Sequence, residues 1–307
     1  MILTTDTLLQ EPVLRTLAYY DLFDYPLTTS EVYTFLPVGN IQEEELSVAL
    51  QAMAMEGIIK KAKGFWFLPH RSESSVERRI EMELRGKKMW KMARRMSMLM
   101  RHVPFVRGIF ISGQLCRYIA DRNSDIDYFV VTEPNRLWIV RCILVLFRRV
   151  VLLNNRKYFC VNYYVTSDNL KIQERNPYVA CEVASVKPMF NRELFEEFMQ
   201  ENTWVSDYFP NFSMSRIKVQ DGVEKASSIQ KKLELCLPNK AALWLDIRLM
   251  KFTRAFWQRK FPSHSQRAHE ISLRTRRNES RAHPNDVSAI ILQKYYEGLR
   301  RYGVLKG

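Results

Sequence analysis

The chain has few cysteines, and their spacing is not that of a protein stabilised by disulfides or by a structural zinc ion. Its 307 residues include five cysteines, an odd number without any CxxC pair, so the sequence indicates neither a disulfide framework nor a structural zinc site. The first residues, MILTTDTLLQEP, also lack the basic start and apolar middle of a secretory signal. We therefore expect a protein of the reducing cytoplasm.

The sequence has no uninterrupted apolar run that could span a membrane. Its most apolar segment, LWIVRCILVLFRRVVLL at residues 137–153, contains three arginines and is shorter than the roughly 20 apolar residues that a span needs. The segment instead predicts a buried helix that runs into a strand. We expect no membrane partner.

Helical spacing of apolar residues predicts three helices before Gly57. A Thr cap at residue 28 or 29, with Glu31 behind it, suits the entry to the second helix. The β-prone residues 58–69 then predict a hairpin. Three helices followed by a hairpin are typical of a winged-helix domain, which we place at residues 1–75.

This first domain lacks positive charge. Residues 16–59 contain seven acidic residues and no lysine or arginine, whereas the whole chain has 47 basic and 33 acidic residues and a net charge of +14. Acidic helices repel DNA phosphates. We therefore expect the domain to serve in protein packing or oligomerisation rather than in DNA binding.

The next expected helix, in contrast, is rich in basic residues. Residues 78–102 carry nine basic and two acidic residues. Met89, Met92, Met96 and Leu99 recur at helical spacing and predict the buried stripe of that helix. The basic face is either a solvated surface or a means of steering a phosphate-bearing ligand.

Strand-like and helix-like segments alternate in the middle of the chain, which predicts a mixed sheet of the α/β (α+β) class at residues 76–210, with ligands at strand ends. The expected strands cover residues 106–113, 125–132 and 157–166, and the expected helices cover residues 114–122 and 136–150. A helical pattern after Pro210 predicts a C-terminal helical domain at residues 211–307. His264, His269 and His283 do not share a ligand spacing, so the sequence does not indicate a metal site built from them.

Two aspartates stand one residue apart at the start of the second expected strand. Because side chains alternate along a strand, Asp125 and Asp127 point to the same side of the sheet. Carboxylates this close repel each other, and we favour a divalent cation as the remedy over a shared proton or a basic neighbour. Gly113 ends the preceding strand at a turn, where backbone N–H groups can meet phosphate oxygens. The pattern predicts a site for Mg²⁺ and a nucleotide.

The residues around this pair resemble a known family. SGQ at residues 112–114, followed by SDIDYFVV at residues 124–131, resembles the signature of the nucleotidyltransferase superfamily that includes DNA polymerase beta. More narrowly, the chain resembles bacterial nucleotidyltransferase-like proteins with an N-terminal winged helix. That resemblance covers most of the chain and rests on AYYDLFDYPLT, RLWIVR, CVNYYV, ENTWVSDYFPN and AHPND.

The resemblance implies Mg²⁺-dependent transfer of a nucleotidyl group from an NTP to an acceptor that the sequence does not identify. It assigns the metal to Asp125 and Asp127, which would also be the catalytic carboxylates. The residues that the resemblance, or nearness to the turn, assigns to the nucleotide phosphates are Gly113, Gln114, Ser124, Arg117 and Arg122.

Two positions differ from the family pattern. Gln114 stands where the family has Ser after Gly, and Asn162 stands where the superfamily has a third carboxylate. Asn162 can still offer a metal its carbonyl oxygen. Asp168 and Glu182 are alternatives for the third carboxylate. Asp168 suits a turn, and Glu182 suits a helix surface or a buried ion pair as well as a site.

Three functions stay open at this point. The first is the nucleotidyltransferase. The second is a nucleotide-binding or protein-interaction module of the same fold whose catalytic set has decayed, which Gln114 and Asn162 favour. The third is nucleic-acid binding through residues 78–102 and 267–281, which their positive charge favours.

Overall fold

A five-stranded mixed sheet forms the centre of the computed structural model, which describes residues 5–217, 227–263, 265, 270, 273–282 and 286–305. The strands are β3 (Val106–Ser112), β4 (Asp127–Thr132), β5 (Cys160–Thr166), β6 (Lys187–Phe190) and β7 (Glu279–Arg281), in the order β6-β3-β4-β5-β7. β4 and β5 are parallel, and the other neighbouring strands are antiparallel. The predicted mixed α/β sheet is confirmed.

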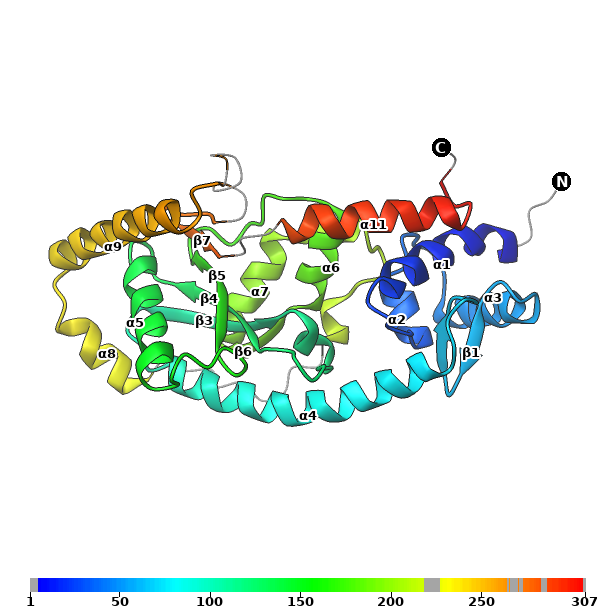
Figure 1. Ribbon diagram of the computed structural model, residues 1–307, viewed down its shortest axis with the longest axis horizontal. Helices are drawn as coiled ribbons and strands as arrows, with labels where there is room; N and C mark the ends of the chain where they lie inside the picture. Colours follow the sequence, from blue (N-terminus) through cyan, green and yellow to red (C-terminus); the bar gives the residue numbers. More distant parts are fainter. Residues whose placement is uncertain are drawn as a thin grey trace.

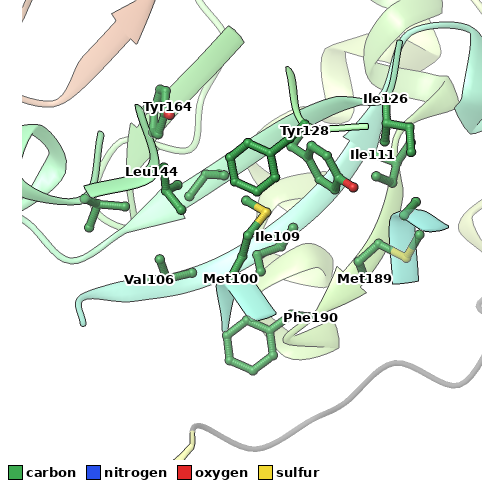
Figure 2. Close-up of a cluster of buried hydrophobic side chains, with 14 of the residues drawn as sticks. Met100, Val106, Ile109, Ile111, Ile126, Tyr128, Leu144, Tyr164, Met189 and Phe190 are labelled. Atoms are coloured by element: carbon green, nitrogen blue, oxygen red, sulfur yellow. The ribbon is translucent and has the colours of Figure 1, made fainter. Parts of the chain in front are cut away.

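Successive side chains along the strands pack alternately into two separate cores, one on each face of the sheet. Tyr128 and Val130 of β4 point into one core, together with residues of α4 (Ser74–Met100) and α5 (Leu137–Val150), as Figure 2 shows. Phe129 and Val131 point into the opposite core, which α6 (Pro177–Ser185) and α7 (Arg192–Glu201) cover. By the same alternation, Asp127 belongs to the side of the sheet that α6 and α7 cover.

The apolar segment at residues 137–153 forms α5, which connects the parallel strands β4 and β5. Its first half is buried, as predicted: Leu137, Trp138 and Val140 are fully inaccessible. The expected run into a strand is wrong, because α5 ends at Val150 and β5 begins only at Cys160. None of the described helices is both long and apolar enough to cross a bilayer.

The N-terminal segment contains the predicted three helices and hairpin. They are α1 (Thr5–Asp21), α2 (Thr29–Thr34), α3 (Glu43–Met55), β1 (Lys60–Ala62) and β2 (Phe65–Phe67). The expected cap is present, since the Thr28 hydroxyl accepts the Glu31 N–H while the Glu31 carboxylate accepts the Thr28 N–H. Gly57 follows α3 with a φ of 74°, a left-handed conformation that suits glycine at a helix end.

A long helix, α4, runs beneath the sheet from the hairpin to the end where α5 lies (Figure 1). Met89 is buried and Met92 and Met96 are partly buried, but Leu99 is 50% exposed, so the predicted stripe is wrong at its last position. The buried line instead ends on Ser97 and Met100, because the three-residue step from Met96 to Leu99 is shorter than the helical turn of about 3.6 residues and rotates Leu99 away from the buried face.

The C-terminal helices pack against different parts of the molecule. α8 (Ser228–Leu235) and α9 (Asn239–Lys260) lie at the α5 end, whereas α11 (Val287–Arg301) lies against α1 and α6 (Figure 1). Tyr295 and Leu299 of α11 are part of the core formed by the N-terminal helices. The segments 1–75 and 211–307 therefore share one core. His264, His269 and His283 lie outside the described residues.

Candidate metal and nucleotide site

A cavity of about 440 Å³ lies at one edge of the sheet, where parts of the chain that are distant in sequence meet. The ends of β3 and β4 form its floor, α6 and α11 supply two walls, and the loop after α1, with Phe23 and Tyr25, supplies another. Met82 of α4 also lines it. The acidic residues on its surface are Asp121, Asp125, Asp127 and Glu182.

Asp125 and Asp127 point into this cavity together. One carboxylate oxygen of each lies within 4.8 Å of the other and of the Cys160 thiol sulfur. Ile126, between them, is fully buried, and its backbone is held by the N–H of Cys160 and the carbonyl of Lys157. The extended pairing therefore begins just before β4, which turns both flanking carboxylates to the same side.

Gly113 contacts Asp127 so closely that no other residue fits there. Its φ of +67° is in the range that favours glycine, and a Cβ at this position would lie 2.5 Å from Asp127 Oδ2. The turn and the carboxylate therefore form one unit at the sheet edge.

The helix expected at residues 114–122 is wrong. Only a single 3₁₀ turn, η1 (Gln114–Arg117), follows Gly113, and Tyr118 ends it with a left-handed φ of 60°. The Ala120 N–H then donates to the Met82 carbonyl of α4, so the segment is anchored to a neighbouring helix instead of continuing as one. So short a turn has little helix dipole to offer a phosphate.

The electrostatics of the site follow from crowded carboxylates. Burial, then the negative charges of Asp125 and Glu182, raise the pKa of Asp127 to about 8. Burial, then the charges of Asp127 and Asp125, raise the pKa of the Cys160 thiol to about 12, so this thiol is neutral at physiological pH. The site thus holds more negative charge than its own hydrogen bonds compensate.

Asn162 supports Asp127 instead of presenting an oxygen to the cavity. Its Nδ2 donates to Asp127 Oδ1 at 2.7 Å, and its Oδ1 accepts from the Cys160 thiol at 3.2 Å. Asn162, which was predicted as a metal ligand, is therefore a hydrogen-bond partner of Asp127.

Glu182 is the third carboxylate that the structure brings to the aspartates. It lies on α6, lines the same cavity and contributes to the raised pKa of Asp127. Its Oε1 is 3.5 Å from Arg117 Nη2, so it is also in an ion pair. Asp168 lies in an exposed turn beyond Thr166, at the opposite end of β5 from the site, and the turn interpretation is the one that fits.

The residues predicted to bind phosphate are only partly assembled. Ser124 Oγ donates to Gln114 Oε1 at 2.7 Å and accepts the Asp121 N–H, so Gln114 and Ser124 are tied to each other at the cavity edge. Arg117 lines the cavity beside Glu182. Arg122 is exposed outside it, which removes Arg122 from the predicted set.

Gly86, in the middle of α4, supports the site and was not predicted. A Cβ there would lie 2.0 Å from the Tyr118 carbonyl oxygen, so only glycine lets α4 approach the segment after η1. A glycine inside an otherwise helical pattern was the available signal.

Comparisons of the chain with protein-family models, with curated proteins and with solved structures found no match.

Proposed function

We propose that the protein binds an NTP together with Mg²⁺ and transfers the nucleotidyl group to an acceptor, with Asp125 and Asp127 as the metal-binding carboxylates. The observation that carries the proposal is their placement in one cavity, with Asp127 directly against the Gly113 turn. The resemblance to the nucleotidyltransferase superfamily points to the same residues.

The donor set fits a hard divalent cation. Mg²⁺ prefers oxygen ligands and is usually held in nucleotide sites by one or two carboxylates together with substrate phosphates. The crowding that raises the pKa of Asp127 is what a bound cation would relieve. The neutral Cys160 thiol is a poor ligand for Mg²⁺ and serves as a hydrogen donor within the cluster. The cation would supply charge neutralisation at the phosphates.

The surrounding residues suggest further roles in this reaction. Among the described residues that line the cavity, Arg117 is the basic one, and it would contact a phosphate group. Asp121 and Glu182 are both paired with an arginine, Asp121 with Arg78 at 2.9 Å and Glu182 with Arg117 at 3.5 Å. Glu182 has the longer contact and is close enough to Asp127 to raise the pKa of that carboxyl, so Glu182 would accept a proton from an acceptor hydroxyl or amine. A winged-helix-like domain at residues 1–75 would form part of the substrate site through Phe23 and Tyr25.

The test is calorimetry with Mg²⁺ and each NTP. Asp125→Asn and Asp127→Asn should each abolish Mg²⁺-dependent NTP binding, because either change removes a charge that the cation requires. Asp168→Asn is the matched control: it removes an exposed carboxylate at the other end of β5 and should bind as the wild type does. Unchanged NTP affinity in both cavity variants would disprove the metal site.

A second candidate is a module that binds the nucleotide without turning it over. It is favoured by the Gln114–Ser124 hydrogen bond and by the amide of Asn162 at the position of a third carboxylate. Two assays separate the candidates: pyrophosphate release from a γ-labelled NTP over a panel of acceptors, and transfer of the label of an α-labelled NTP to an acceptor or, by mass spectrometry, to the protein itself. Binding without any release would favour the module.

A further inference from the structure

The outer face of α9 exposes three aromatic side chains. Trp244 is 61% exposed, Phe252 69% and Phe256 40%. With Arg248 they recur every four residues, so they form one stripe along the helix. Large aromatic side chains gain free energy when they leave water, and a contiguous exposed group of them marks an interaction surface.

The orientation of α9 is fixed by its other face. Asp246 is 3% exposed, and its Oδ1 accepts the backbone N–H groups of Trp138 and Ile139 at the start of α5. Ala242 is fully buried beside it. Since these contacts hold the inner face against the domain, the aromatic stripe faces outward, at the end of the molecule opposite to the N-terminal helices (Figure 1).

The charge of this face has a single sign. α9 has one acidic residue, the buried Asp246. Its exposed charged residues are Lys240, Arg248, Lys251, Arg254, Arg259 and Lys260. Two of them lie over the aromatic rings, with the Arg248 guanidinium 5.3 Å from the Trp244 ring and the Lys260 ammonium 5.8 Å from the Phe256 ring.

These features favour an anionic membrane surface over other partners. A two-fold contact with a second copy would bring the same basic residues face to face. A nucleic acid would use the cations and aromatic rings but not the aliphatic side chain of Leu243, which is 36% exposed next to Trp244 on the same helix. Aliphatic, aromatic and basic side chains together are what an interfacial helix presents to a bilayer.

We propose that α9 docks the protein on the surface of an anionic membrane. Trp244 and Phe252 enter the boundary between headgroups and acyl chains, and the lysine and arginine side chains of α9 reach the lipid phosphates. This contact is peripheral and leaves α9 lying along the surface. It therefore departs from the expectation of no membrane partner, which rested on the lack of an apolar run that could span a bilayer. It does not depend on nucleotide chemistry in the cavity.

The experiment is vesicle flotation of the full chain with phosphatidylcholine alone and with phosphatidylcholine containing phosphatidylglycerol. The wild type should float with the anionic vesicles only, and added salt should weaken binding. Trp244→Ser with Phe252→Ser should lower the partition coefficient by about tenfold or more. Arg248→Glu with Lys251→Glu should lower it on anionic vesicles as well.

The matched control is Met55→Ser with Leu84→Ser, which removes apolar side chains that are 84% and 57% exposed on α3 and α4. This variant should float as the wild type does. The proposal is wrong if the wild type stays unbound at physiological salt, binds neutral vesicles equally well, or is unaffected by the aromatic substitutions. Two other results would assign the stripe to a different partner. Light scattering could show a dimer, or anisotropy could show binding of a labelled oligonucleotide. If the aromatic variant loses that dimer or that binding while it still floats with the vesicles, the stripe belongs to that partner instead.

Discussion

Asp127 is central to the site, and its carboxylate also lowers the stability of the folded protein. It contacts the Gly113 turn, accepts a hydrogen bond from Asn162 and shares the cavity with Asp125 and Glu182. Burial, and then the negative charges of Asp125 and Glu182, disfavour its ionised form and raise its pKa to about 8. Functional sites often hold such strained charge, at the expense of stability.

We predict that Asp127→Asn stabilises the metal-free protein at pH 8 and above. The folded-state pKa of about 8 lies above the usual value, so the folded wild type keeps a proton that the unfolded chain loses. Wild-type stability therefore falls as pH rises from about 4 to 8, whereas the Asn variant has no such loss. The variant should melt roughly 2–4 °C higher at pH 8 with chelator present.

Thermal unfolding at a series of pH values measures this difference, which should vanish near pH 4. Added Mg²⁺ should raise the melting temperature of the wild type and leave the variant unchanged, because binding to the folded state alone stabilises it. A variant that is less stable than the wild type at pH 8 in chelator would contradict the carboxylate crowding.

At the scale of elements, the approach of α4 to the segment after η1 positions the turn of the site. Gly86 removes the Cβ that would collide with the Tyr118 carbonyl, and the Met82 carbonyl receives the Ala120 N–H. This contact explains why residues 118–122 do not form the expected helix: their backbone is bonded to α4.

We predict that Gly86→Ala destabilises the protein by about 3 kcal/mol, because the added methyl group overlaps backbone that has no free rotamer to adopt. Gly298→Ala is the control. Gly298 lies inside α11, and an alanine Cβ there would have no other atom within 4 Å, so this change should stabilise by about 0.5–1 kcal/mol. Denaturant unfolding of both variants measures the contrast, and equal effects would contradict the close approach.

At the scale of the whole molecule, the C-terminal helix completes both the N-terminal core and the cavity. Leu299 is fully buried among residues of the N-terminal helices, and Val287 and Ile291 line the cavity beside Glu182 and Tyr178. The basic helix α4 is also partly neutralised in three dimensions, since Arg79 is buried against Glu31 and Glu83. Its charge is thus less available to nucleic acid than the sequence indicates.

We predict that Leu299→Ala lowers the free energy of unfolding by about 2–5 kcal/mol and loosens α1 and α3 as well as α11. Ile290→Ala on the same helix is the control, because Ile290 is 49% exposed and should change stability by less than about 0.5 kcal/mol. Hydrogen exchange resolved by segment is the measurement. Faster exchange confined to α11 would contradict the shared core.

The features that depend on interactions between residues close in sequence could be predicted from the sequence. The Thr28–Glu31 cap and Gly57 bound helices through contacts within a few residues, and the alternation of a strand places Asp125 and Asp127 on one side whatever lies around them. The segments that form β3, β4 and β5 were predicted for the same reason, since their apolar runs are bounded by turn residues.

The tertiary structure alone decided which distant residues meet. Glu182 reaches the aspartates because α6 packs on the face of the sheet that carries Asp127, and no spacing in the sequence encodes that contact. The segment after Gly113 loses its helix because α4 takes one of its backbone donors. Leu99 and the α9 aromatics stay exposed although their spacing suits burial, because a hydrophobic pattern specifies a face and only the neighbouring elements determine whether that face is covered.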